Sequence, residues 1–363
     1  MPIAFCPDAR AERIAVLYQS ISPPTIGGLR KAPKPGGYAD SGADIAYALK
    51  RAGYQVVTPK AQPDPAMDLD WVFPDDVAGI VAARAAGATL LWANTVLFEG
   101  HPLGAVMGKM WIVGQPPKVM HRIDDKFATN LQLRVHSLPV AVSILAALSA
   151  SPGVQALDKL DAQRLATLGL FFPMIVKPVR GRGSQGVTRV DSSAALHEAA
   201  QALLEGAEFG DQLIIEQYLP GEELTVTVFP AQGAQGGRAL PPVRRFNHQD
   251  GVAPYNGTVA VAHNSAALSA EAQQSPAVMV VLDACVDAAR VVGALAPIRI
   301  DCRQDSQGSY RLFDLNAKPY MTGAGRPGRD DQDSLSAIAA RAMGWDYAAL
   351  LGAMASGAWR VVS

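Results

Sequence analysis

An apolar run ending in a lysine leads into three glycines, two arginines and a serine in the stretch Met174–Val187. Glycine lets backbone N–H groups approach an anion closely, and Lys177, Arg180 and Arg182 can supply positive charge around it. The lysine precedes the glycines, and the spacing differs from that of a P-loop. The stretch therefore predicts a phosphate-binding loop of another kind, with an ordinary hairpin turn as the alternative.

Oxygen-bearing side chains recur in the segment Pro297–Asn316, where two apolar runs flank a polar turn and predict a β-hairpin. Strand alternation places Arg299 with Asp301 on one face, and Asp314 with Asn316 on one face of the partner strand. Two carboxylates and an amide oxygen suit Mg²⁺, with Mn²⁺ as an alternative. A solvated polar face with a salt bridge is the other interpretation of this hairpin.

The N-terminal segment alternates strand and helix patterns. Arg13–Tyr18 predicts a short buried strand, Ser41–Ala52 a helix, and Gly53–Thr58 and Ala88–Ala93 further strands. Such alternation predicts a parallel sheet. The Pro- and Gly-rich stretch Ser20–Tyr38 predicts a loop at the carboxyl end of the first strand, where open α/β sheets bind ligands.

The middle of the chain continues with helix and strand patterns after the turn signal at Gly114–Pro117. We expect one helix over His121–Arg134, a strand-to-helix region over Ala141–Ala150, and an amphipathic helix over Ser192–Leu204 with a serine as its N-cap. Clean alternation in Glu223–Phe229 predicts a half-buried antiparallel strand.

Composition limits the class of protein. A chain of 363 residues with 49% hydrophobic and 18% charged residues predicts a folded protein of two or three domains. The formal charge of -1 provides no global basic field for nucleic acid or an anionic membrane, so neither is expected as a partner. No apolar run reaches the roughly 20 residues of a membrane-spanning helix. Three distant cysteines without C-x-x-C spacing predict buried thiols and a cytoplasmic location.

Together these motifs resemble the ATP-grasp superfamily, and they are most similar to its D-alanine–D-alanine ligase-like branch. The similar segments are Ile175–Pro178 with the glycine-rich loop, Ile214–Leu219, Glu223–Val226, Ile298–Asp301 and Asp314–Pro319. The resemblance implies an α/β fold of the α+β ATP-grasp type. It divides the chain into an N-terminal parallel α/β domain (1–115), a central subdomain with a glycine-rich lid (116–217) and a C-terminal subdomain with the metal-binding hairpin (218–363).

The resemblance also implies roles for individual residues. ATP would be contacted at its phosphates, adenine and ribose by Lys126, Lys177, Gly183, Ser184, Glu216, Gln217, Leu219 and Glu223. Asp301, Asp314 and Asn316 would bind Mg²⁺. Arg299 would act in catalysis with Lys177, by stabilising an acyl-phosphate and the later tetrahedral intermediate.

The chain departs from the family pattern where those ligases hold their substrates. Tyr320 replaces a glycine after the metal-binding asparagine, and Gly323–Arg326 offers no serine. The segment Arg244–Gly257 falls where related ligases carry a loop that touches the triphosphate and substrate. The substrate-binding candidates are Arg244, Arg245, His248, Asn256 and Arg326.

The implied activity is that of an ATP-dependent carboxylate–amine ligase that forms an amide or dipeptide through an acyl-phosphate and releases ADP and phosphate. Its partners would be small carboxylates and amines such as amino acids, and a homodimer is compatible with the family. Two alternatives stay open: an ATP-dependent carboxylase or acyl-transfer enzyme, and a nucleotide-binding regulatory protein without turnover.

Overall fold

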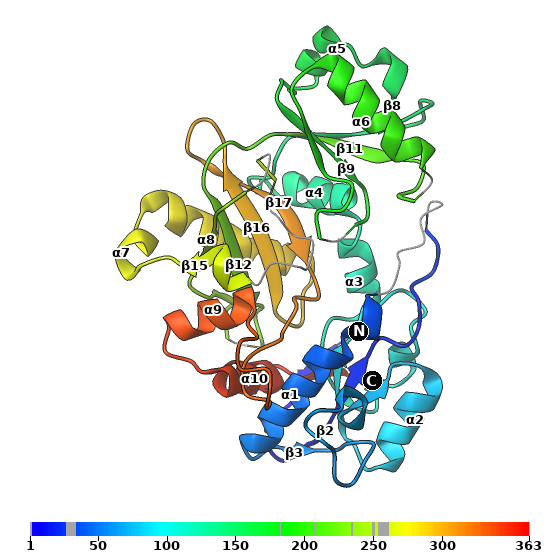
Figure 1. Cartoon of the computed structure of the whole chain (residues 1–363), viewed down its shortest axis with the longest axis vertical. Coiled ribbons are helices and arrows are strands. Elements are labelled where there is room, and N and C mark those ends of the chain that lie inside the picture. Colours follow the sequence, from blue (N-terminus) through cyan, green and yellow to red (C-terminus); the bar gives the residue numbers. More distant parts are fainter. Residues whose placement is uncertain are drawn as a thin grey trace.

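Three β-sheets with their covering helices build the molecule, and each sheet occupies its own lobe in Figure 1. The computed structural model describes residues 2–26, 34–181, 183–206, 208–233, 235–248, 251–252 and 261–362. In that view the first sheet lies at the bottom, the second at the top and the third at the left.

The first sheet has seven strands in the order β1-β18-β6-β5-β2-β3, with β4 also paired to β2. The strands are β1 (Ile3–Phe5), β2 (Arg13–Tyr18), β3 (Gln55–Val56), β4 (Val72–Pro74), β5 (Leu90–Asn94), β6 (Trp111–Val113) and β18 (Trp359–Val361). Strands β3, β4 and β5 each pair in parallel with β2, and β6 pairs in parallel with β5, which confirms the predicted parallel sheet. The final strand, β18, pairs antiparallel with both β1 and β6, so both ends of the chain lie in this lobe (Figure 1). The domain boundaries at 115 and 217 stay a prediction. Strand β18, near the end of the chain, pairs with strands of the first sheet and so belongs to that sheet.

Burial on both faces holds β2 within this sheet. Its residues Ile14–Leu17 have no exposed surface, and alternate members belong to two different hydrophobic clusters. One cluster includes the buried face of α1 (Ala39–Arg51), and the other includes that of α2 (Val77–Ala85). A continuous apolar run is the pattern of a parallel strand covered by helices on both sides.

The second sheet has five strands in the order β10-β9-β11-β7-β8. They are β7 (Ser143–Ala147), β8 (Val154–Ala156), β9 (Met174–Pro178), β10 (Thr188–Val190) and β11 (Leu213–Gln217), packed with α5 (Ala162–Thr167) and α6 (Ser193–Glu205). Ser192 caps α6 by accepting a bond from the Ala195 N–H at 3.2 Å, as predicted. The helix expected in the second half of Ala141–Ala150 is wrong, because the chain after β7 turns at Pro152-Gly153, where Gly153 has a φ of 80°.

The third sheet has six strands in the order β15-β14-β12-β16-β17, with β13 paired to β12. They are β12 (Glu223–Phe229), β13 (Arg238–Ala239), β14 (Val243–Arg245), β15 (Ser265–Ala267), β16 (Ile298–Gln304) and β17 (Tyr310–Asn316). The prediction of a half-buried β12 is wrong, since all seven of its residues are buried. Helix α8 (Pro276–Val291) covers its apolar face, while Thr225 and Thr227 on the polar face bond to Asp301 and Ser336. Helices α7 (Ala270–Gln273), α9 (Leu335–Ala342) and α10 (Tyr347–Ser356) complete this part of the chain.

The single helix predicted over His121–Arg134 is wrong, because two helices meet there. Helix α3 (Pro117–Ile123) ends before Asp125, and α4 (Lys126–Val135) begins after it. Asp125 is extended and accepts a bond from the Ala128 N–H at 2.8 Å, which is the geometry of a helix N-cap. This break places Lys126 in the first turn of α4, the helix that lies just below the second sheet in Figure 1.

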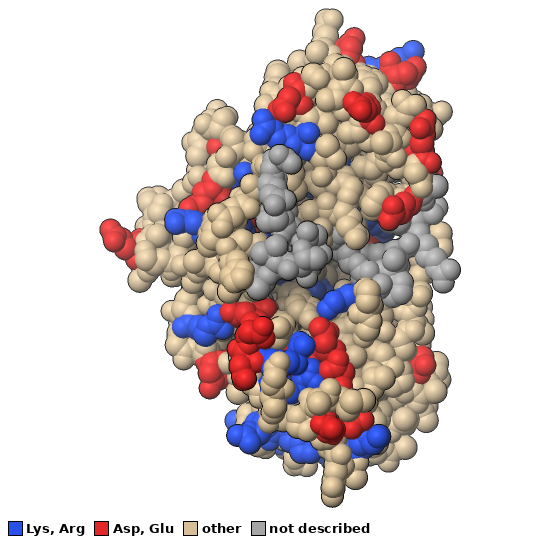
Figure 2. Space-filling view, in the orientation of Figure 1, with Lys and Arg blue, Asp and Glu red and all other residues tan. Residues whose placement is uncertain are grey.

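Two predictions from composition can be compared with the described residues. The thiols of Cys6, Cys285 and Cys302 are free and buried, as expected. Among the described helices, none has the length and apolar character needed to cross a membrane. On the face drawn in Figure 2, acidic and basic side chains lie intermixed.

Candidate active site

A cavity of about 1010 Å³ lies where the three sheets meet. The second sheet, its glycine-rich loop and the residues just after β11 contribute Lys177, Gly183, Ser184, Glu216, Gln217 and Leu219. The third sheet contributes Glu223, Arg245, Arg299, Asp301, Asp314 and Asn316. Lys126 of α4 also lines the cavity. The volume reaches the upper end of the range of about 300–1,000 Å³ found for small-molecule sites.

The predicted acidic hairpin is confirmed, with β16 and β17 paired antiparallel. Asp301 lies opposite Asp314, and Arg299 lies opposite Asn316, so these four side chains share one face. Asp301 accepts bonds from Thr225 Oγ1 at 2.7 Å and from Arg299 Nη2 at 3.2 Å. The salt bridge of the alternative interpretation is therefore present, but it lies in a buried cavity wall.

Asp314 forms an ion pair with Lys126 across the cavity. Burial by itself would raise the pKa of Asp314, but the ammonium groups of Lys126 and Lys177 and the guanidinium of Arg299 lower it below its ordinary value. The carboxylate is therefore held in its anionic form, which is the form that binds a metal ion.

Lys177 and Glu216 form a second ion pair, with 2.5 Å between Nζ and Oε1. Lys177 Nζ also donates to the carbonyl oxygen of Phe313, at 3.2 Å, next to Asp314. Burial raises the pKa of Glu216, although the charge of Lys177 opposes the shift. Lys177 thus joins the second sheet to the acidic hairpin, and it lines the same cavity as Asp314.

The glycine-rich loop connects β9 and β10, which form an antiparallel hairpin. It is therefore both a hairpin turn and a wall of the cavity, where Gly183 and Ser184 have φ values of 61° and 56°. Arg180, at the start of the loop, bonds to Asp124 and Asp125 at 3.2 and 3.3 Å. Arg182 lies outside the described residues.

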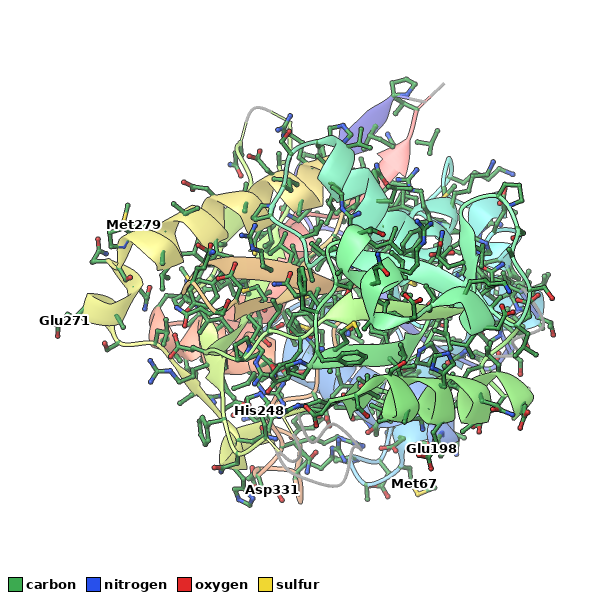
Figure 3. The ribbon with its side chains drawn as sticks, turned by 90° about the horizontal axis from the view of Figure 1, so that it is seen from above. Met67, Glu198, His248, Glu271, Met279 and Asp331 are labelled. Carbon is green, nitrogen blue, oxygen red and sulfur yellow. The ribbon has the colours of Figure 1, made fainter. Side chains whose placement is uncertain are left out.

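Glu223, the residue predicted for ribose, lies at the start of β12 and accepts a bond from His248 Nε2 at 2.9 Å. Arg303 Nη1 lies 3.8 Å from the same carboxylate oxygen. Figure 3 shows His248 on the same side of the molecule as Asp331, whereas Met279 and Glu271 lie at the outer end of the third lobe. His248 therefore contacts a predicted ATP residue instead of lying free in a loop.

The remaining substrate candidates are placed differently from one another. Arg245 is buried and lines the cavity, whereas Arg244 is exposed and pairs with Glu222. Arg326 is buried in ion pairs with Asp44 and Asp68 and is not among the residues that line the cavity. Asn256 lies outside the described residues.

The acidic hairpin carries oxygen ligands suited to a metal ion. Within the described residues there is no group of three or more His, Cys, Asp and Glu side chains that could hold a metal. Asp301 and Asp314 are nevertheless cross-strand neighbours beside an amide oxygen, and each is paired with a cation, Arg299 or Lys126. This donor set fits Mg²⁺, which uses one or two carboxylates together with substrate phosphates and water.

Sequence reasoning missed a part of the cavity wall that comes from the first lobe. Lys34, Tyr38 and Asp40 line it together with Lys318 and Tyr320. The loop over Ser20–Tyr38 was expected at a ligand-binding edge, but no sequence signal singled out these side chains. The replacement of a family glycine by Tyr320 was the one available indication.

Solved structures define the class of fold. The chain matches the D-alanine–D-alanine ligase from Bacillus anthracis complexed with ATP, with a TM-score of 0.62 and 19% identity over 94% of each chain. It also matches the VanG D-Ala:D-Ser ligase from Enterococcus faecalis, with a TM-score of 0.60 and 12% identity over 94% of this chain and 98% of that one. The fold is that of the ATP-grasp proteins, as the sequence resemblance implied.

Sequence comparison defines the family. The chain is 31% identical over 188 residues to the D-alanine–D-alanine ligase of Gloeobacter violaceus and 32% identical over 228 residues to that of Alkalilimnicola ehrlichii. These matches span 52% and 61% of this chain but only 55% and 62% of the two relatives, less than two thirds of their length. The family model for the D-ala D-ala ligase C-terminus matches residues 140–356, more than half of the chain. The chain belongs to this family.

Proposed function

We propose that this protein is an ATP-dependent carboxylate–amine ligase that forms an amide or dipeptide bond through an acyl-phosphate and releases ADP and phosphate. The supporting observation is the meeting of Lys126 and Lys177 with Asp314 in one cavity. Phosphoryl transfer depends mainly on positioning and on neutralisation of charge, which these groups supply.

The proposed roles are those that the family resemblance implies, and the positions of the side chains in one cavity support them. Lys126 and Lys177 bind the ATP phosphates, and the backbone at Gly183 and Ser184 covers them and keeps water from the acyl-phosphate. Asp301, Asp314 and Asn316 would hold Mg²⁺, which neutralises phosphate charge when bound. Arg299 stabilises the negative charge that develops on the reacting carboxyl group.

The adenosine end of ATP would bind beside the end of β11 in the second sheet. Glu216, Gln217 and Leu219 belong to the end of β11 and the residues after it, and all three line the cavity. Glu223 would bind the ribose hydroxyls, and His248 Nε2 donates a bond to the Oε2 atom of its carboxylate. We assign Arg245 to the substrate side, because it is the buried, cavity-lining arginine of its strand.

Amino acids are the proposed substrates, because the relatives are named D-alanine–D-alanine ligases. A homodimer, a cytoplasmic location and the three-domain division stay predictions. A carboxylase or acyl-transfer enzyme would show the same ATP chemistry with a different acceptor, and a regulatory protein would bind ATP without turnover.

Replacing Asp314 tests the proposal. Asp314→Asn keeps the size of the side chain but removes the charge that pairs with Lys126, and we expect ATP-dependent phosphate release to fall by about 10²-fold or more. Phosphate release would be measured with ATP, Mg²⁺ and pairs of amino acids or other small acids and amines.

Asp287→Asn in α8 is the matched control, since the Asp287 side chain is half-exposed and pairs only with its helix neighbour Arg290 among the contacts described. The control should retain native turnover. Native turnover in Asp314→Asn would refute the assigned site. If the unaltered protein binds ATP but releases no phosphate with any pair, the regulatory alternative is correct.

A further inference from the structure

Arg303 of β16 is a largely buried cation that lines the cavity beside the residue proposed to bind ribose. It follows Asp301 by two positions and lies directly opposite Glu223 of β12 in the antiparallel register. Side chains that lie opposite each other on neighbouring strands are close enough to interact. Arg303 is therefore placed to act on the Glu223 carboxylate.

Two backbone carbonyl groups fix the guanidinium group of Arg303. Its Nε donates to the carbonyl oxygen of Gly221 at 3.0 Å, and its Nη1 donates to that of Gly251 at 2.6 Å. Gly221 precedes β12, and Gly251 belongs to the segment between β14 and β15. Because both acceptors are backbone groups, they hold Arg303 in place independently of the Glu223 side chain.

The same arginine lies over the ring of Tyr218, with its Cζ atom 5.4 Å from the ring centroid. This distance is within the range of a cation–π contact. Gly251 packs closely on Tyr218, since a Cβ atom added to this glycine would lie 2.5 Å from the tyrosine hydroxyl oxygen. Tyr218 stands between Gln217 and Leu219, the residues proposed to contact adenine. Arg303 therefore connects the proposed adenine side of the cavity with the proposed ribose side.

The Glu223 carboxylate is held at one of its two oxygens. His248 Nε2 donates to Oε2 at 2.9 Å, and Arg303 Nη1 lies 3.8 Å from the same oxygen. Within the described part of the chain, no side chain bonds to the other oxygen, Oε1. A carboxylate only accepts hydrogen bonds, whereas a hydroxyl group can donate them. Oε1 is therefore the atom of Glu223 that is available to the hydroxyl groups of a ligand.

We propose that Arg303 and His248 are positioning residues for ribose: they hold Glu223 Oε2, so that Oε1 accepts hydrogen bonds from the ribose hydroxyls of ATP. The inference rests on the proposed contact of Glu223 with ribose and adds the residues that orient it. Hydrogen bonds weaken steeply when donor and acceptor are poorly aligned. A carboxylate free to turn would bind a ribonucleotide and its deoxy analogues with more nearly equal affinity.

The test is equilibrium binding of ATP, 2′-deoxy-ATP and 3′-deoxy-ATP to the full chain, measured by titration calorimetry with Mg²⁺. For the native protein, we expect the Kd of ATP to be about tenfold or more below that of at least one deoxy analogue, the size of a hydrogen bond to a charged group. In Arg303→Met this ratio should fall severalfold, because the Kd of ATP rises while the Kd values of the deoxy analogues change little. Arg303→Lys should retain part of the ratio, since a positive charge remains beside Oε2.

Arg311→Met is the matched control. Arg311 lies opposite Arg303 on β17, pairs with Asp305 and is not among the described residues that line the cavity. This variant should keep the native ratio. His248→Leu removes the other contact with Oε2 and should also lower the ratio, so it provides the test if Arg303→Met does not fold.

The outcomes separate the inference from the functions on which it depends. An unchanged ratio in folded Arg303→Met would overturn the role of Arg303, because a direct attraction of Arg303 to the phosphates would weaken all three nucleotides alike. An unchanged ratio in His248→Leu would do the same for His248. Equal affinity of the native protein for the three nucleotides would overturn the ribose contact of Glu223 as well. The ligase function is decided separately, by phosphate release with pairs of acids and amines.

Discussion

At the scale of single residues, the ion pair of Lys177 and Glu216 removes two charged groups from water. Both side chains are almost completely buried, so each charge would be destabilising without the other. Asn130 Nδ2, at 3.4 Å, is the further partner of Glu216. A buried pair of this kind adds little net stability, but losing one member leaves an uncompensated charge.

Lys177→Met should lower the free energy of unfolding by about 3–5 kcal/mol, because it leaves the buried Glu216 carboxylate without the positive charge of Lys177. The double variant Lys177→Met/Glu216→Gln should recover most of this loss, because no charge remains buried. Urea unfolding would measure both effects. Phosphate release should stay lost in the double variant, since the ammonium group proposed to bind phosphate is absent. Recovered turnover would contradict the role proposed for Lys177.

At the scale of elements, the buried carboxylate of Asp75 joins the carboxyl ends of several parallel strands. It accepts bonds from the N–H and hydroxyl of Ser20 after β2, both at 2.8 Å, and from Thr95 Oγ1 after β5 at 2.5 Å. His101 Nε2 lies 3.1 Å away, and the Leu103 N–H donates to the other ring nitrogen, so Nε2 is the donor to Asp75. The carboxylate therefore ties together the carboxyl ends of β2, β4 and β5.

Asp75→Asn should lower the free energy of unfolding by about 2–3 kcal/mol at pH 7, because a charged acceptor of several bonds is lost. Burial would raise the pKa of Asp75, but the bonds from His101, Thr95 and Ser20 outweigh it and lower the pKa. A lowered pKa contributes stability above the ordinary aspartate value, and this contribution is lost as pH falls through the folded value.

The difference in unfolding free energy between native protein and Asp75→Asn should therefore shrink as the pH is lowered from 7 towards about 3. Asp158→Asn, at an exposed aspartate, should show no such difference at any pH. A constant gap between native protein and Asp75→Asn over this range would show that the charge of Asp75 does not contribute.

At the scale of the whole molecule, one aspartate attaches the first lobe to the segment that follows the acidic hairpin. Asp44 of α1 accepts bonds from Thr322 Oγ1 at 2.7 Å, from Arg326 Nε at 2.8 Å, and from Arg329 Nε and Nη2 at 2.8 and 2.9 Å. Arg326 also bonds to the carbonyl oxygen of Pro65 at 3.0 Å. The Tyr320 hydroxyl donates to Asp40 of the same helix, so this segment contacts α1 at more than one residue.

Asp44→Ala should lower the free energy of unfolding by about 3–5 kcal/mol, because two partly or fully buried guanidinium groups lose their shared carboxylate. Asp287→Ala, at a partly exposed ion pair within one helix, should change it by about 0.5 kcal/mol or less. Urea unfolding of the two variants side by side is the measurement. Equal stability of the two would refute a connecting role for Asp44.

Local patterns in the sequence determined the strands and loops on which the residues of the candidate active site lie. The apolar run before Lys177, the glycines after it and the alternation around Asp301 and Asp314 follow from short-range preferences, and the described structure confirms the hairpin that they predicted. The order of the motifs along the chain carried the resemblance to the ATP-grasp superfamily. Each strand and turn depends on residues close together in the chain, which is why one sequence sufficed to predict them.

Only the tertiary structure decided which side chains meet across the cavity. Lys126 with Asp314 and Tyr320 with Asp40 are separated by 188 and 280 positions, and no local pattern encodes such pairs. The same reason applies to Arg326, which the sequence offered to a substrate and which lies buried against Asp44 in the fold. Ion pairing depends on three-dimensional distance, and that distance is set only when the three sheets pack together.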